Sequence, residues 1–195
     1  MCFFHSSSCF RYSLFSLLIL CGALCLVLTT ASAQSGAKGA SAMSFTLRSP
    51  DFTDNADIPK QFTCSGEDRS PALEWSGAPA GTKSFALIVD DPDAPAGVWV
   101  HWVIFSIPSS AHSLRGGIEK KDQLADGTHQ GRNDFDKVGY NGPCPPPGKP
   151  HRYFFKLYAL DGALALGAGA TKADVERAMQ GHILGHAEWV GRFGR

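Results

Sequence analysis

The chain has 195 residues, of which 44% are hydrophobic and 18% are charged, and its formal net charge at pH 7 is zero. This composition is that of a globular protein, and the length predicts one domain with a single hydrophobic core. The balanced charge excludes the strongly basic surface that is typical of proteins that bind nucleic acids.

The first 33 residues are predicted to be a signal peptide. Arg11 is the only charge among them, and a mostly apolar run covers residues 14–28. Ala31-Ser-Ala33 has the small-x-small pattern of a signal-peptidase site. The alternative is a membrane anchor, but the run is shorter than the ~20 residues that span a bilayer. Cleavage near Ala33 predicts a periplasmic or secreted protein, with residues 34–44, rich in Ala, Gly and Ser, as a flexible leader.

Residues 45–195 are predicted to form an all-β domain, an antiparallel β-sandwich with one or two short helices. Thr171-Lys-Ala-Asp174 resembles a helix capping box, and Gly181 suits the position just past the helix end. Residues 112–137 are polar and predict loops with at most one short strand. Many short strands with a single helix indicate an antiparallel sandwich. The expected strands are 44–48, 60–63, 73–75, 84–89, 98–107, 151–160 and 186–193.

Two turn-rich loops each run directly into an aromatic strand. Residues 142–148 are all glycine or proline except Cys144, and the strand that follows begins at His151. Alternation along that strand puts His151 and Tyr153 on one face. The second loop, residues 90–97, precedes the strand that carries His101. The same alternation groups His101 with Trp99, Val103 and Phe105, and a buried histidine there needs a polar partner, for which Asp91 and Asp93 are candidates.

Together, these loops and strands resemble the phosphatidylethanolamine-binding protein family, most closely its bacterial Raf-kinase-inhibitor-like group. The resemblance runs from about Pro50 to the C-terminus. Ala72 stands where the group usually has a second proline, and Asp136 stands where it usually has glycine. The residues that carry the resemblance are Asp91-Pro-Asp-Ala-Pro95, His101, Gly142-Pro-Cys-Pro-Pro146 and His151-Arg-Tyr153, with Ser70-Pro-Ala-Leu-Glu-Trp75, Asn133-Asp-Phe135 and Tyr158-Ala-Leu-Asp161.

The resemblance implies a similar fold and an anion pocket for phosphate-like head groups. From spacing alone, a core histidine bonded to a backbone carbonyl is the favoured interpretation of His101, and the two aspartates suit a turn. The resemblance reverses this for His101, because it matches a pocket residue of the family. Imidazole, phenol and backbone N–H donors that converge on a small concavity suit an oxyanion, and the aspartates would orient the imidazoles or bind a cationic part of the ligand. The predicted ligand-binding residues are Asp91, Asp93, His101, Gly142, His151 and Tyr153.

Two carboxylates near two imidazoles also suggest a metal site or an acid/base pair. The chain has no His-Glu-x-x-His, Cys-x-x-Cys or Gly-x-Ser-x-Gly pattern, so we predict a binding protein with no metal, cofactor or catalytic step. Its expected ligand is a small anion or phospho-head-group, with the membrane only as a possible source. Two alternatives stay open: a modulator of a protease or kinase that acts through surface contacts with a protein partner, and a hydrolase that uses His and Asp.

Six cysteines fall to two, Cys64 and Cys144, if the signal peptide is removed. An even number in an exported chain suggests a disulfide, and two thiols that never meet are the alternative. Neither Cys21 nor Cys25 directly follows a small residue, which argues against lipid attachment at either position.

Overall fold

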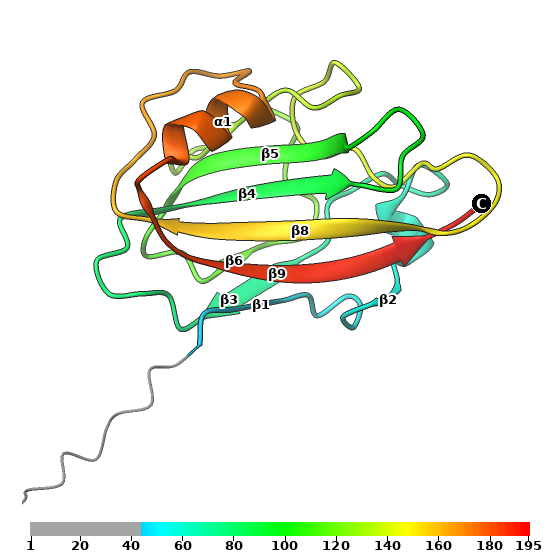
Figure 1. The fold of residues 1–195 in the computed structure, drawn as a ribbon, viewed down its shortest axis with the longest axis horizontal. Helices are drawn as coiled ribbons and strands as arrows, with labels where there is room; N and C mark the ends of the chain where they lie inside the picture. Colours follow the sequence, from blue (N-terminus) through cyan, green and yellow to red (C-terminus); the bar gives the residue numbers. More distant parts are fainter. Residues whose placement is uncertain (1–43) are drawn as a thin grey trace, which may run out of the picture. The chain divides into compact units, whose positions relative to one another are not determined.

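The computed structural model describes residues 44–195, which form two β-sheets, one α-helix and one 3-10 helix (Figure 1). The larger sheet has the order β2 (Ala56–Asp57), β9 (Ile183–Phe193), β8 (His151–Leu160), β4 (Ser84–Asp91), β5 (Trp99–Pro108) and β7 (His129–Gln130). The smaller sheet has the order β1 (Thr46–Arg48), β3 (Leu73–Ser76) and β6 (Ser113–Leu114). All pairings are antiparallel except that of β2 with β9. The predicted all-β architecture is therefore confirmed.

The larger sheet is buried on both faces. One face packs against the smaller sheet, where the Trp75 ring meets the edge of Phe85 at a centroid distance of 5.3 Å. The other face packs against the helix α1 (Lys172–Met179), where Val175 and Met179 cover Ile88. Burial on both faces explains why β4 is a continuous apolar run rather than an alternating one, with all of its residues buried.

Helix α1 begins and ends as its sequence predicts. The backbone N–H of Asp174 donates to the Thr171 hydroxyl, and the Asp174 carboxylate accepts from the backbone N–H of Thr171. Gly181 follows the helix with a φ of 80°. Lys172 fastens the helix to the sheet, because its amine lies 2.5 Å from the carboxylate of Asp90, which is fully buried in β4.

Three short segments differ from the prediction. The expected strand at residues 60–63 is the 3-10 helix η1 (Lys60–Phe62), held by a hydrogen bond from the backbone N–H of Phe62 to the carbonyl of Pro59. Residues 112–137 contribute two short strands, β6 and β7, where at most one was expected. The strand β2 was not predicted. Such short strands form through pairing with distant segments, so their own residues carry little signal.

The alternation predicted for β5 is wrong at His101. In the pairing with β4, Val89 faces Trp102 and Asp90 faces Val100, so one residue of β5 is skipped between them. This β-bulge turns the His101 ring toward Tyr153, away from the face that carries Val103.

The predicted signal peptide, residues 1–33, lies outside the described residues, as does all of the predicted leader except Ser44. Within residues 44–195, no helix combines the length and apolar character needed to cross a membrane.

Candidate functional site

A cavity of about 250 Å³ opens at the end of the larger sheet where β4 ends and β8 begins. Trp99, Phe135 and Pro145 are among its apolar walls, and His101 and His151 also line it. The structure therefore brings together the two histidines that the sequence singled out, although they are 50 residues apart.

His151 is held by Asp91. Its Nδ1 lies 2.7 Å from Oδ2 of Asp91, and both side chains are buried. A carboxylate can only accept, so Nδ1 carries the proton and donates. The Asp91 carboxylate is itself fixed, because its Oδ1 accepts a hydrogen bond of 2.8 Å from the backbone N–H of Asp93. This arrangement leaves Nε2 as the ring nitrogen of His151 that is open to a ligand.

His101 is oriented in the same way by a different acceptor. Its Nδ1 donates to the backbone carbonyl of Asn141 at 2.7 Å, and its ring packs edge-on against Tyr153 and Phe135, at centroid distances of 5.1 and 5.2 Å. Burial lowers the pKa of His101 below its ordinary value. The ring is thus favoured in its neutral form, with Nε2 unprotonated.

The Tyr153 hydroxyl is buried and has no hydrogen-bond partner among the described residues. Burial and the nearby Asp91 carboxylate raise the pKa of Tyr153, so the phenol keeps its proton. Its ring packs against His101, but Tyr153 is not among the residues that line the cavity.

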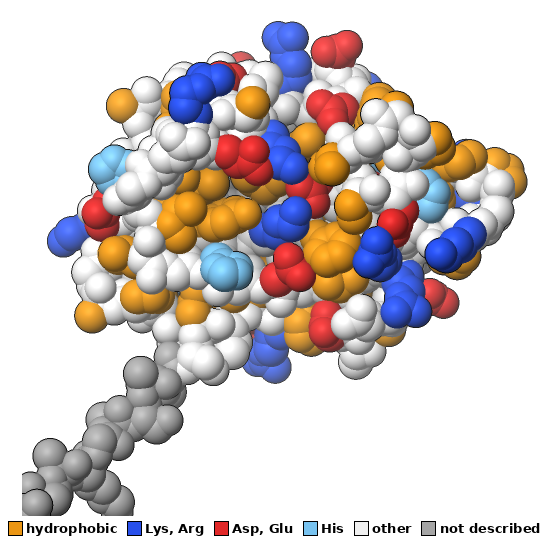
Figure 2. All heavy atoms as spheres, in the orientation of Figure 1, with side chains coloured by type: hydrophobic (Ala, Val, Ile, Leu, Met, Phe, Trp, Pro, Cys, Tyr) orange, Lys and Arg blue, Asp and Glu red, His pale blue; other side chains and the backbone are white. Residues whose placement is uncertain are grey.

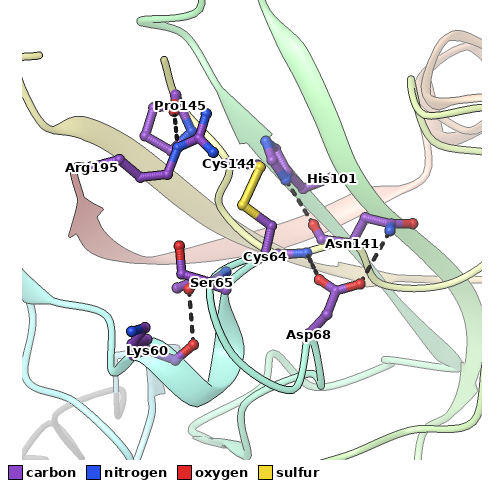
Figure 3. The surroundings of a disulfide bond; sticks show 11 residues. Lys60, Cys64, Ser65, Asp68, His101, Asn141, Cys144, Pro145 and Arg195 are labelled. Carbon is purple, nitrogen blue, oxygen red and sulfur yellow. Dashed lines mark hydrogen bonds between the residues drawn. A yellow bond between two sulfur atoms is a disulfide. The ribbon is translucent and has the colours of Figure 1, made fainter. Parts of the chain in front are cut away.

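Gly142 does not offer its N–H to the cavity. That group donates to Oδ1 of Asp68 at 2.6 Å, and the same carboxylate accepts from the side-chain amide of Asn141 (Figure 3). A Cβ at Gly142 would lie 2.2 Å from the carbonyl oxygen of Phe62. Glycine is therefore required here for close packing, and the expected role of its N–H as a ligand donor is corrected.

Asp93 does not line the cavity, and its carboxylate is bound to Arg152. Its Oδ1 accepts from Nη2 of Arg152 at 2.7 Å, and its Oδ2 accepts from Nε at 2.8 Å and from the backbone N–H at 3.0 Å. These bonds lower the pKa of Asp93 to about 2. Asp93 is thus not the partner of His101 that the sequence suggested. It holds the loop after β4 to the start of β8.

Cys64 and Cys144 form a disulfide with a Cα–Cα distance of 5.4 Å (Figure 3). Cys144 lines the cavity, and the backbone N–H of Cys64 donates to the carbonyl of Pro143. The bridge therefore ties the proline-rich wall of the cavity to the segment that follows η1.

Four further residues shape the cavity, and of these the sequence grouped only Trp99 with a predicted site residue, His101. Asp68 and Asn141 organise the loop, and Trp99 and Phe135 form its aromatic walls. Phe135 lies in the Asn-Asp-Phe segment that carries part of the family resemblance, and Asp68 bonds to residues more than 70 positions away, which local sequence patterns do not reveal. Within residues 44–195, no group of three or more His, Cys, Asp or Glu side chains is arranged to hold a metal ion.

Residues 48–194 match the sequence profile of the family described as "Phosphatidylethanolamine-binding protein". The chain belongs to the phosphatidylethanolamine-binding protein family. A UPF0098 protein of Methanothermobacter thermautotrophicus is 52% identical over 149 residues, which cover 76% of this chain and 98% of the relative. A protein of Mycobacterium tuberculosis named "Putative lipoprotein LppC" is 42% identical over 166 residues, 85% of this chain and 79% of that one.

Solved structures of family members share the fold. E. coli YbcL, described as a new member of the mammalian family, superposes with a TM-score of 0.73 at 35% identity, and covers 77% of this chain and 98% of its own. The homolog CT736 from Chlamydia trachomatis, described as a putative phosphatidylethanolamine-binding protein, gives a TM-score of 0.71 at 37% identity, with coverages of 78% and 98%.

Proposed function

We propose that this member of the phosphatidylethanolamine-binding protein family binds a small phosphate-class oxyanion, free or as a phospholipid head group, in the His101–His151 cavity. One observation carries the proposal. In both imidazoles Nδ1 donates to an acceptor within the protein, the Asn141 carbonyl for His101 and the Asp91 carboxylate for His151, so only Nε2 of each ring can contact a ligand. Rings fixed in this way need little reorganisation when a ligand arrives, which favours binding.

Proton uptake follows from this geometry. With Nδ1 protonated, the neutral ring has a lone pair on Nε2, which repels an oxyanion. Protonation of Nε2 turns the lone pair into a donor and adds a charge-assisted hydrogen bond. The proposed site therefore binds the anion more tightly as the pH falls. For His101, whose pKa is lowered by burial, the gain begins below the ordinary value near pH ~6.5.

The surroundings support a small ligand. The cavity has mostly apolar walls, which weaken competition from water and strengthen the few polar contacts. Its volume of about 250 Å³ suits a head group rather than a whole lipid. The Tyr153 ring packs edge-on against His101 and helps to fix the orientation of that imidazole.

Calorimetry tests the proposal. Phosphate and phosphoethanolamine are titrated into the protein at several pH values, in buffers of different ionisation enthalpy, so that proton uptake is counted directly. We expect affinity to rise as the pH falls. His101→Ala and His151→Ala should each lose about 1.5–3 kcal/mol, which is roughly ten- to hundredfold in affinity.

His182→Ala is the matched control. His182 donates to Asp161 at 2.8 Å, as His151 does to Asp91, but this pair is exposed and far from the cavity. This variant should bind as the parent does. Equal affinity in the parent and both cavity variants, or saturable binding only with an added divalent metal, would overturn the proposal.

The Asp91–His151 pair also resembles the carboxylate and imidazole of a hydrolase, in which the imidazole acts as a general base. Cys144, which lines the cavity, is held in the disulfide and is not a free nucleophile. An attacking water would be needed, with its proton passing to Nε2. A panel of phosphoesters and carboxylic esters distinguishes the two functions: turnover that is lost in His151→Ala favours the hydrolase, and binding without turnover favours the binding protein.

We also propose that the protein is exported. A relative that is 42% identical is named a putative lipoprotein, and the described part of this chain contains a disulfide, which is typical of exported proteins.

A further inference from the structure

A second depression, of about 550 Å³, lies where β8 begins and β9 ends. Lys149, Arg152 and Arg192 line it, together with Asp57 and Asp93. Figure 2 shows basic side chains gathered beside acidic ones at this end of the sheet. Side chains alternate along β8, so Arg152 projects from the face opposite to His151. The depression is therefore separate from the cavity.

The pairing of the strands places the charges in a row. Asp57 of β2 is the register partner of Arg192 in β9, and Arg192 is the register partner of Arg152 in β8. Asp93 completes the row through its two-pronged contact with Arg152. Two guanidinium groups thus stand on directly opposite residues of neighbouring strands, an arrangement that is destabilising between like charges.

The positive charge of the row is only partly balanced. Within residues 44–195, Arg152–Asp93 is the one ion pair inside the depression, and neither Arg192 nor Lys149 has a carboxylate oxygen within 4.0 Å. Both side chains are exposed. An anion seated between the arginines would satisfy free donors and relieve the repulsion at the same time.

We propose that this depression is a second anion site, which takes a phosphate-class oxyanion between the guanidinium groups of Arg152 and Arg192, with Lys149 beside it. The planar guanidinium fork matches the oxygens of a phosphate, free or in a lipid head group. The residues of this site do not line the His101–His151 cavity, and Arg152 lies on the face of β8 opposite to His151. Because its groups are exposed, its affinity falls as salt is added.

The test uses inorganic phosphate as the probe. The Nε–H signals of Arg152 and Arg192 are followed by nuclear magnetic resonance during a phosphate titration at low ionic strength. Both signals should shift and saturate together in the parent. Arg192→Gln should weaken the response of Arg152 about tenfold, the loss of one charge-assisted hydrogen bond. Equal affinity in Arg192→Gln and the parent would overturn the proposal.

Arg48→Gln is the control. Arg48 is an exposed arginine of β1 that pairs with Glu74, so its loss changes the net charge equally but leaves the depression intact. This variant should respond to phosphate as the parent does. If Arg48→Gln weakened the response as much as Arg192→Gln, the effect would come from net charge alone and the proposal would be wrong. His101→Ala separates the two sites: it should weaken cavity binding roughly ten- to hundredfold while the arginine signals still respond to phosphate.

Urea unfolding in phosphate-free buffer gives a second readout. Arg192→Gln should unfold at the same or a higher urea concentration than the parent, because a repulsion is removed. A midpoint at lower urea concentration would mean that Arg192 serves as a structural partner of Asp57, contrary to the proposal.

Sedimentation with phosphatidylcholine vesicles, with and without phosphatidylglycerol, then shows whether the bound phosphate group belongs to a lipid or is free. Binding only to the anionic vesicles, and lost in Arg192→Gln, indicates a lipid head group, whereas no sedimentation with phosphate binding retained indicates a free oxyanion.

Discussion

At the scale of single residues, two aspartates near the cavity adopt left-handed backbone conformations. Asp68 has a φ of 54° and uses its carboxylate to anchor Gly142. Asp136 has a φ of 55° in the turn that follows Phe135, where the family resemblance places glycine. Its backbone N–H donates to the carbonyl of Asn133, whose side chain closes the same turn by accepting from the backbone N–H of Phe135. The departure from the family pattern is thus tolerated at a cost in backbone strain.

Asp136→Gly should stabilise the protein. The Asp136 side chain is 91% exposed and makes only a 4.0 Å contact with Arg132, so little is lost with it. Glycine removes the backbone strain, which stabilises the folded protein, but it also has more conformational entropy in the unfolded chain, which offsets part of that gain. The net effect should be a rise in the free energy of unfolding of up to about 1 kcal/mol. Urea unfolding measures the change.

Asp122→Gly is the matched control for this substitution. Asp122 is also an exposed loop aspartate, but it is not among the residues with positive φ. Glycine relieves no strain there and should leave the protein equally or less stable. The account fails if both variants change stability by the same amount in the same direction.

At the scale of elements, the proline-rich loop is held against the segment around η1 by several independent contacts. The Tyr140 hydroxyl donates to the carbonyl of Phe62 at 2.7 Å, Gly142 donates to Asp68, and the disulfide joins Cys64 to Cys144. The hydrogen bonds act only in the folded protein, whereas the disulfide also restricts the unfolded chain. Its contribution should therefore appear mainly in stability.

Reduction of the disulfide should lower the free energy of unfolding without removing the cavity. The bridge joins residues 80 positions apart, and the chain-entropy model gives roughly 4–5 kcal/mol of stabilisation for closing a loop of that length. The parent should unfold at lower urea concentration with a reductant than without. The double variant Cys64→Ser, Cys144→Ser should match the reduced parent and ignore the reductant. Coincident transitions for the oxidised and reduced parent would contradict this expectation.

At the scale of the whole molecule, the proposed export predicts that the mature chain is shorter than the full sequence. The mature chain should begin at or near Gln34, because Ala31-Ser-Ala33 precedes it. N-terminal sequencing of the protein recovered from the cell envelope or medium measures this. Replacement of Ala31 and Ala33 by leucine should block cleavage and serves as the control. A parent chain that still begins at Met1 would favour the membrane anchor instead.

The sequence alone was sufficient for features set by local spacing. Alternation in the first residues of β8 correctly placed His151 and Tyr153 on the buried face and Arg152 on the exposed one. The Thr171 cap and Gly181 correctly bounded α1. These features depend on the steric and hydrogen-bonding preferences of neighbouring residues, which are the same in any fold.

The tertiary structure decided which groups meet. The bulge at His101 arises from the register of β5 against β4, and alternation along β5 alone cannot reveal it. The sequence predicted Asp93 and Gly142 as ligand-binding residues. In the structure Asp93 binds Arg152, 59 residues away, and the N–H of Gly142 binds Asp68, 74 residues away. The sequence supplied the inventory of donors and acceptors. Their pairing was settled only when strand register fixed the distances between them, because a hydrogen bond requires its two groups to lie within about 3 Å.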